Sequence, residues 1–225
     1  MVKLQHLMIG LVAGVLTLST SFAGSVPDLY KVKQELIQYH DSGDYMHEIV
    51  AVDQQAAAYL LSQADQNAQL PAAQQKKLAV VFDIDETALS NYPNMKAFDF
   101  GGTLQDKMAA MNQGNDPAIQ PTLMLYQLAL KHKVAVFFIT GRPQSMQQST
   151  TDNLHKVGFT NWNSLIMRPN DYNQSSIVSF KSSARQKIVN AGYDILFTIG
   201  DQNSDLKGGY ADKTFKLPNP YYYLP

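Results

Sequence analysis

Asp83 and Asp85 stand one residue apart, directly after an apolar run over residues 78–82. Alternate residues share one face of a strand, but the chain turns at the carboxyl end of a strand, so both carboxylates can reach one pocket. A carboxylate nucleophile with a second carboxylate beside it suits phosphoryl transfer through a covalent aspartyl intermediate. Because phosphate oxygens repel such a nucleophile, the site also needs positive charge.

Further polar groups follow at the ends of other apolar segments. They are Thr140, Gly141 and Arg142 after residues 134–139, Lys181 before an expected helix, and Asp201 and Asp205 after residues 195–199. In an open α/β sheet, ligands bind outside the carboxyl ends of the strands. We therefore expect these groups to meet Asp83 and Asp85 in one pocket.

The carboxylates of this set indicate a site for Mg²⁺, a hard cation that prefers oxygen ligands and keeps several waters. Asp83 is predicted to be both the nucleophile and a metal ligand. Asp85 would protonate the leaving oxygen and then deprotonate the attacking water, and its backbone carbonyl would bind the metal. Asp201 would complete the metal site, and Asp205 would bind the ion directly or through water.

The remaining groups suit the binding of phosphate. Thr140 would hold a phosphate oxygen through its hydroxyl and backbone N–H, with Gly141 in the same binding loop, and Lys181 would neutralise charge on Asp83 and the phosphoryl group. Arg142 has two open roles: it binds substrate, or it pairs with a neighbouring acid and holds the loop. Ordinary roles compete with these, since Thr140 can cap a helix, Lys181 can be solvated at a helix start, and Gly-Asp pairs are common in turns.

Strands that alternate with helices must position these groups. Apolar runs indicate strands at residues 78–82, 134–139, 164–167 and 195–199, and helical patterns cover residues 27–69, 122–133, 143–157 and 182–191. Such alternation implies an α/β fold in which helices flank a parallel sheet with right-handed crossovers. Ser42-Gly43 should divide the first helical stretch into two helices.

Residues 92–121 do not fit a plain crossover between a strand and a helix. This stretch contains three prolines and three glycines and is longer than most loops in compact domains. Because it starts just after the aspartate pair, we predict that it forms a small, mainly helical cap over the site, together with elements from residues 27–70. Length and composition favour a single domain over residues 24–225.

Residues 1–23 have the pattern of a signal peptide: Lys3, an apolar run over residues 7–18, and small residues at Ser21 and Ala23. The alternative is a retained membrane anchor, but the apolar run is too short to span a bilayer comfortably. The absence of cysteine excludes a disulfide framework and a lipid-bearing cysteine. We therefore expect a periplasmic or secreted protein with no stable membrane anchor after cleavage.

Charge argues against a nucleic-acid polymer as partner. Cleavage would remove Lys3 from the 18 Lys and Arg and none of the 19 Asp and Glu, which leaves a net charge of about −2 and no basic footprint. Small molecules are the expected partners. The sequence 221–223 consists of three tyrosines, which would form either a homodimer contact or a tail packed on the core.

Serine or histidine hydrolysis is disfavoured as an alternative chemistry. The sequence has no Gly-x-Ser-x-Gly elbow, and none of its five histidines stands next to a motif described above.

The four motifs, in their order along the chain, resemble those of the haloacid dehalogenase (HAD) superfamily. Within it, residues 83–87, Asp-Ile-Asp-Glu-Thr, are similar to class B acid phosphatases in the broad sense, subfamily IIIB, the group that includes plant acid phosphatases and vegetative storage proteins. Further matches to that group lie at residues 42–45, 137–143, 180–185 and 214–220. The resemblance thus covers nearly the whole chain after residue 23.

This resemblance implies a Rossmann-like core with a cap, Mg²⁺ dependence, and hydrolysis of phosphate monoesters at acidic pH. Some plant storage members lack the nucleophile, whereas Asp83 is present here. Two alternatives stay open: a storage or phosphate-binding protein that uses the fold without catalysis, and a phosphotransferase that gives the phosphoryl group to alcohols.

Nucleoside monophosphates are a further expectation that rests largely on similar phosphatases. Aromatic side chains can stack on a nucleobase, although at this density they are more often part of the core. Tyr92 is the aromatic residue that we assign to substrate binding, and the other candidates are Phe98, Phe100, Trp162 and Tyr222.

Overall fold

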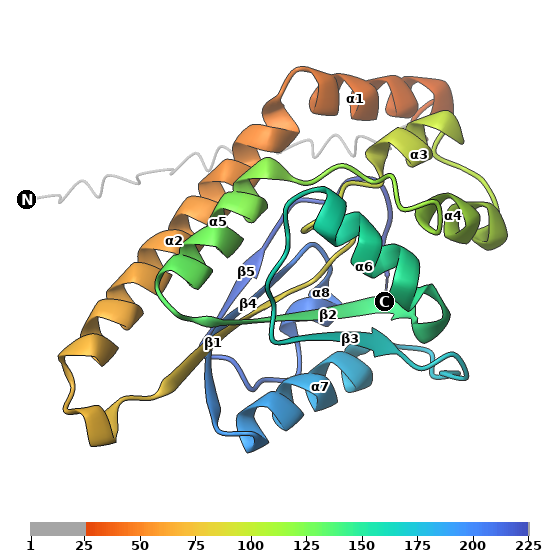
Figure 1. Cartoon of the computed structure of the whole chain (residues 1–225). Helices are drawn as coiled ribbons and strands as arrows, with labels where there is room; N and C mark the ends of the chain where they lie inside the picture. Colours follow the sequence, from red (N-terminus) through yellow and green to blue (C-terminus); the bar gives the residue numbers. More distant parts are fainter. Residues whose placement is uncertain (1–25, 225) are drawn as a thin grey trace, which may run out of the picture.

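A computed structural model describes residues 26–224, and the expected signal peptide over residues 1–23 lies outside them. A five-stranded sheet forms the centre of the molecule, with helices on both faces (Figure 1). The strands are β1 (Lys77–Phe82), β2 (Ala135–Pro143), β3 (Ser164–Arg168), β4 (Tyr193–Gly200) and β5 (Lys213–Lys216). The α-helices are α1 (Leu29–Asp41), α2 (Asp44–Gln69), α3 (Tyr92–Ala97), α4 (Leu104–Met111), α5 (Gln120–Lys131), α6 (Gln147–Lys156), α7 (Val178–Asn190) and α8 (Asn203–Leu206), and the 3-10 helices are η1 (Ala72–Gln74) and η2 (Gln144–Met146).

The strand order is β3-β2-β1-β4-β5, and every pair of neighbours is parallel. The chain runs from β1 outward to β2 and β3, and then returns to the other side of β1 to form β4 and β5. The direction of winding therefore changes between β1 and β4, and open α/β sheets bind ligands at the carboxyl ends of the strands at such a point. The predicted α/β fold with a parallel sheet is confirmed.

Alternate residues of the central strand β1 pack into different layers. Val80 and Phe82 face a core shared with α2, α5 and α6, while Ala79 and Val81 face a smaller core shared with α7. Because both faces of the sheet are covered, β1 is apolar on both sides, as is typical of parallel sheets.

The first helical stretch breaks at Ser42-Gly43, as predicted, and Gly43 adopts the left-handed conformation with a φ of 93°. The helix α2 then packs on the core through Tyr45, Ile49, Ala56 and Leu60. This position differs from the expectation that residues 27–70 contribute to a cap. Its apolar stripe faces the sheet, so α2 belongs to a core layer, whereas α1 lies beside α3 at the end where the strands finish (Figure 1).

Two elements in the last third of the chain, β5 and α7, differ from the sequence-based expectations. The edge strand β5 was not expected, because its four residues are mostly exposed and form no apolar run. The helix α7 begins at Val178, so Lys181 lies in its first turn rather than before it.

Residues 92–121 contribute α3 and α4, which lie beyond the carboxyl ends of the strands (Figure 1). A capping box starts α4: the Thr103 hydroxyl accepts from the Asp106 backbone N–H at 3.1 Å, and the Asp106 carboxylate accepts from the Thr103 N–H at 2.9 Å. A helical segment therefore stands beside the site, and its action as a cap stays a prediction. None of the helices in residues 26–224 has the length and apolar character needed to cross a membrane.

Candidate active site

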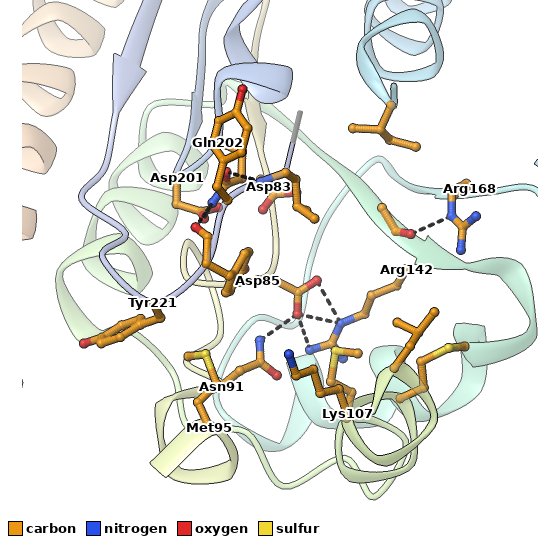
Figure 2. A pocket seen from close by; sticks show the side chains of 18 of the residues that line it. Asp83, Asp85, Asn91, Met95, Lys107, Arg142, Arg168, Asp201, Gln202 and Tyr221 are labelled. Atoms are coloured by element: carbon orange, nitrogen blue, oxygen red, sulfur yellow. Dashed lines mark hydrogen bonds and ion pairs between the residues drawn. The ribbon is translucent and has the colours of Figure 1, made fainter. Parts of the chain in front are cut away.

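A pocket of about 540 Å³ opens at the carboxyl ends of the central strands. The backbone N–H of Asp83 donates to the Ile199 carbonyl at 3.0 Å, which extends the contact between β1 and β4 as far as the site. Of the residues assigned from the sequence to catalysis, phosphate binding or the metal, those that line the pocket are Asp83, Asp85, Gly141, Arg142, Lys181 and Asp201. Figure 2 labels Asp83, Asp85, Arg142 and Asp201. The structure therefore brings four separate sequence motifs to one cavity.

Three buried carboxylates form an acid cluster consisting of Asp83, Asp201 and Asp205. One oxygen of each lies within 4.8 Å of the others, and the exposed fractions of the residues are 5%, 1% and 2%. Gly200 makes room for this arrangement, because a Cβ at that position would overlap the carboxyl group of Asp205.

Burial and mutual repulsion make ionisation of the acid cluster costly. Burial, with a contribution from Asp205, raises the pKa of Asp83 well above its ordinary value. Burial and the charge of Asp205 likewise raise the pKa of Asp201 to about 7. Without a cation, the cluster therefore holds protons at a pH where exposed aspartates are ionised.

Lys181 lies between two members of the acid cluster. Its Nζ donates to Asp83 Oδ1 at 2.6 Å and to Asp205 Oδ1. Burial opposes the charge on Lys181, but Asp205 and Asp83 outweigh it and raise the pKa of the ammonium. One ammonium does not balance three carboxylates, so a cation with oxygen ligands, such as Mg²⁺, fits this donor set and relieves its repulsion.

The Asp85 carboxylate lies apart from the acid cluster and faces Arg142 (Figure 2). Arg142 Nη2 and Nε donate to Asp85 Oδ1 at 2.8 and 3.0 Å, and Nη2 donates to Asp116 Oδ2 at 2.9 Å. Burial opposes the ionisation of Asp85, but Arg142 outweighs it and lowers the pKa. Of the two roles open for Arg142, the structure therefore shows pairing with acids, and a contact with substrate stays a prediction.

Arg142 reaches these acids because β2 is irregular near its end. The pairing of β2 with β3 shifts between Thr140 and Pro143, which leaves Gly141 and Arg142 outside the regular ladder. A bulge of this kind redirects side chains. The fully buried Thr140 hydroxyl accepts from the Arg142 N–H at 3.0 Å, so Thr140 shapes this turn. Its contact with a phosphate oxygen stays a prediction.

Glu86 supports Asp85 through Asn91, a role that the sequence did not indicate. It adopts a φ of 52° and is fully buried. Its carboxylate accepts from the Asn91 N–H at 2.6 Å and from the Tyr222 hydroxyl at 2.7 Å, and the Asn91 Nδ2 donates to Asp85 Oδ1 at 2.8 Å. Burial, with a contribution from Asp85, raises the pKa of Glu86 to about 8.

Arg185 holds the loop that carries Asp205. It is 1% exposed and donates to the backbone carbonyls of Asp205 and Gly209, each at 2.8 Å, and to that of Lys207. The sequence match over residues 180–185 contains Arg185, but gave it no role. Arg185 follows Lys181 by four residues, which places both side chains on one face of α7. This spacing is the sequence feature that indicates a role for Arg185 near the site.

Tyr92 is not among the residues that line the pocket, and its predicted contact with substrate stays a prediction. Its ring stacks on His40 with the centroids 3.4 Å apart, and its hydroxyl donates to Asp41 at 3.0 Å. Tyr92, at the start of α3, is 5% exposed. Its contacts with His40 and Asp41 join α3 to α1. Trp162 also packs elsewhere, against Phe138 and His155.

The outer part of the pocket has a different chemical character. The apolar residues of α3, α4 and their connection that line it are Met95, Phe98, Phe100, Leu104, Met108 and Met111. Lys107 extends from α4 toward Asn91 and Arg142 (Figure 2). Volumes of about 300–1,000 Å³ are usual for small-molecule sites, so a charged inner part and a largely apolar outer part can both belong to one ligand.

Sequence comparison places these residues in a known group. The family described as "HAD superfamily, subfamily IIIB (Acid phosphatase)" matches residues 23–225. The chain is 41% identical over 152 residues to the Stem 28 kDa glycoprotein of Glycine max, a match that covers 64% of this chain and 59% of that protein. It is 38% identical over 148 residues to Acid phosphatase 1 of Solanum lycopersicum, covering 64% of this chain and 58% of that protein.

Vegetative storage protein 1 of Arabidopsis thaliana is also similar, with 34% identity over 149 residues that cover 64% of this chain and 55% of that protein. The chain spans little more than half the length of these relatives. Among solved structures, the class C acid phosphatase from Bacillus anthracis superposes with a TM-score of 0.64 and 21% identity, covering 85% of this chain and 86% of that one. At that identity the likeness shows a shared fold.

Proposed function

The chain belongs to subfamily IIIB of the HAD superfamily, the acid phosphatase family, and from this premise we propose that it is an exported, Mg²⁺-dependent phosphatase acting through an aspartyl-phosphate on Asp83. The family predicted from the order of the motifs is confirmed. Its relatives include proteins named acid phosphatase and vegetative storage protein, so membership alone does not decide between catalysis and storage. The observation that supports catalysis is that two carboxylates close together in the sequence have different partners. Asp83 accepts from Lys181, and Asp85 accepts from Arg142.

The residues that would hold Mg²⁺ are Asp83, Asp201 and Asp205 through their carboxylates and Asp85 through its backbone carbonyl. When bound, the ion supplies positive charge for the carboxylates and for the phosphate oxygens. Lys181 supplies a second positive charge from the α7 side, through its contact with Asp83 Oδ1. That contact leaves Asp83 Oδ2 as the oxygen for attack.

In the first half of the reaction, Asp83 Oδ2 attacks phosphorus and the bond between phosphorus and the leaving oxygen breaks. Protonated Asp85 gives its proton to that oxygen, so the product leaves as an alcohol. Asn91 and Arg142 hold the Asp85 carboxyl in position for this transfer, through bonds of 2.8 Å each to Oδ1. Asp83 now carries the phosphoryl group as a mixed anhydride.

In the second half, Asp85 takes a proton from a water molecule as that water attacks phosphorus. The bond between phosphorus and the Asp83 oxygen breaks, which releases inorganic phosphate and restores both carboxyl groups. An alcohol in place of the water would make the same site a phosphotransferase. Product analysis with added alcohols separates these two outcomes.

The environment of Asp85 supports activity at acidic pH. Arg142, against the opposing effect of burial, lowers the pKa of Asp85, so the protonated form needed in the first half is populated only in acid. Hydrolysis of esters with poor leaving groups should therefore increase as the pH falls.

Phosphate monoesters with an aromatic or apolar leaving group suit the pocket, and nucleoside monophosphates belong to that class. The inner charged part would take the phosphate, and aromatic residues that line the pocket, such as Phe100 and Tyr222, would contact the remainder. Tyr221 and Tyr222 are partly buried against the site while Tyr223 is 70% exposed, which favours a tail packed on the core over a dimer contact.

The test is phosphate release from p-nitrophenyl phosphate between acidic and neutral pH, with Mg²⁺ and then with excess chelator. Release that the chelator stops and added Mg²⁺ restores is the expected result. A folded protein that binds Mg²⁺ but releases no phosphate from this ester or from a panel of nucleotides would favour the storage alternative. Export is tested separately: the mature protein should begin at Gly24.

A further inference from the structure

The chain after β5 forms a C-terminal tail, residues 217–224, that runs along the carboxyl ends of the strands. Its start is fixed where the Leu217 N–H donates to the Gly200 carbonyl at 2.9 Å, directly before Asp201. Leu217 is fully buried in the core. Residues 221–224 then line the pocket, so the tail borders the acid cluster instead of leaving the molecule.

Asn219 connects this tail to Asp201. Its Oδ1 accepts from the backbone N–H groups of Tyr221 at 2.8 Å and Tyr222 at 3.4 Å. Because only the other end of the amide carries hydrogens, these bonds fix Nδ2 as the end that faces Asp201. The Nδ2 donates to Asp201 Oδ2 at 2.6 Å.

Gln202 makes the same kind of connection from the other side. Its Nε2 donates to Asp201 Oδ2 at 2.6 Å, and its Oε1 accepts from the Leu224 N–H at 3.1 Å. The Nε2 also lies 3.4 Å from the Tyr222 carbonyl (Figure 2 shows Gln202 above Asp201). Two amides, each held by the tail backbone, thus converge on one carboxylate oxygen.

This arrangement orients Asp201 within the acid cluster. With Oδ2 held by two donors, Oδ1 has a single hydrogen bond within residues 26–224, from the Thr87 hydroxyl at 3.5 Å. A carboxylate that is bonded through one oxygen presents the other oxygen in a fixed direction, and such outer partners of metal ligands typically affect metal affinity by about 10–100-fold.

We propose that Asn219, together with Gln202, is a positioning residue for the metal ligand Asp201, and that the C-terminal tail is thereby part of the divalent-cation site. This inference rests on the proposed function only in its use of a divalent cation. It assigns the tail no contact with the reacting atoms.

The experiment compares Mg²⁺ binding to the wild type and to Asn219→Leu by isothermal titration calorimetry, without substrate. Leucine is close to asparagine in size and removes the donor to Asp201. The expected result is Mg²⁺ affinity weakened by about 10–100-fold. In Asn190→Leu, the same change at an exposed position at the end of α7, affinity should stay within about twofold of wild type.

Kinetics distinguish positioning from a direct role. Saturating Mg²⁺ should restore most of the kcat of Asn219→Leu, with the KM for p-nitrophenyl phosphate unchanged. Gln202→Leu should reproduce the loss of affinity, and it replaces Asn219→Leu if that variant does not fold. Wild-type Mg²⁺ affinity in folded variants at both positions would overturn the inference, as would a wild type that binds no divalent cation.

The outcome for the tail is separable from the outcome for the enzyme. If the wild type hydrolyses p-nitrophenyl phosphate and the variants bind Mg²⁺ normally, the proposed function survives and the role of the tail does not. If the wild type binds Mg²⁺ with an affinity that depends on Asn219 but hydrolyses nothing, the role of the tail survives and the proposed function does not.

Discussion

Arg142 holds the Asp85 carboxylate with two nitrogens, Nη2 at 2.8 Å and Nε at 3.0 Å from the same oxygen. Asp83 lies two residues before Asp85 in the chain. Burial and the neighbouring acids raise the pKa of Asp83, whereas Arg142 lowers the pKa of Asp85 against the effect of burial. Pairs of acids whose surroundings move their pKa values apart are typical of sites that divide catalytic roles. The predictions below test this division and the supports around it.

Replacement of Arg142 by glutamine should move the pH profile of the enzyme. Without the guanidinium, the pKa of Asp85 rises, so the protonated acid persists to higher pH and the fall in kcat/KM with rising pH occurs at a higher value. The effect should be largest for an alkyl phosphate, whose leaving oxygen needs the proton. A profile that coincides with wild type would contradict the role of Arg142. Asp85 and Asp116 lose their partner as well, so the variant should lose about 3–5 kcal/mol of stability.

Asp83→Asn should abolish turnover while the fold is kept. The amide is not a nucleophile, and we expect a loss of at least about 1,000-fold in kcat. The melting temperature should stay equal to that of wild type or rise, because one of three mutually repelling buried carboxylates is removed. Asp152→Asn, at an exposed position on α6, is the matched control. Activity of Asp83→Asn near the wild-type level would place the nucleophile elsewhere.

Mg²⁺ binding should be coupled to proton release from the acid cluster. The pKa of Asp201 is raised to about 7 and that of Asp83 is raised well above its ordinary value, so the metal must displace protons below neutral pH. Affinity should therefore weaken as the pH falls below 7, by up to about tenfold per pH unit for each proton displaced. Calorimetry in buffers with different ionisation enthalpies counts the protons. Constant affinity between pH 5 and 8 would contradict the coupling.

Asp53 should make the fold less stable at higher pH. Asp53, on α2, is 5% exposed, its carboxyl group accepts from the Thr122 hydroxyl at 3.0 Å, and burial raises its pKa to about 7. The folded protein thus keeps a proton that the unfolded chain releases above about pH 4. Stability should fall as the pH rises from about 4 to 7 and then level off, and a shift of three pKa units corresponds to about 4 kcal/mol.

Denaturant unfolding of Asp53→Asn at several pH values checks this sign. The variant should lack this pH dependence and exceed the wild type in stability at pH 8, whereas Asp65→Asn, exposed on the same helix, should follow the wild type. Parallel pH curves for Asp53→Asn and wild type would show that Asp53 does not titrate in this range.

The sequence was sufficient to predict four strands of the sheet and the residues brought to its edge, because apolar runs followed by Asp83, Thr140 and Asp201 carry a strong pattern. The supports around them were not predictable. Glu86 and Asn219 bind partners far away in the chain, Tyr222 and Asp201, and Gln202, although it follows Asp201 directly, is held by the distant Leu224.

Tyr92 shows that residue type alone does not fix the contacts of a side chain. It was selected as an aromatic residue able to stack on a substrate, but its neighbour in space is His40 on α1. The edge strand β5 was missed for a related reason, because a short, mostly exposed strand has no apolar pattern and forms only where β4 offers a free edge.

The most direct test of the central claim is to capture the phosphoryl group on Asp83. Asp85→Asn lacks the base for the second half, so with p-nitrophenyl phosphate, whose leaving group needs little protonation, the intermediate should accumulate when Mg²⁺ is present. After rapid quenching in acid, mass spectrometry should find phosphate on Asp83 in this variant and none in Asp83→Asn. Phosphate release by the wild type with Asp83 unmodified at every quench time, or with the label on another residue, would contradict the account.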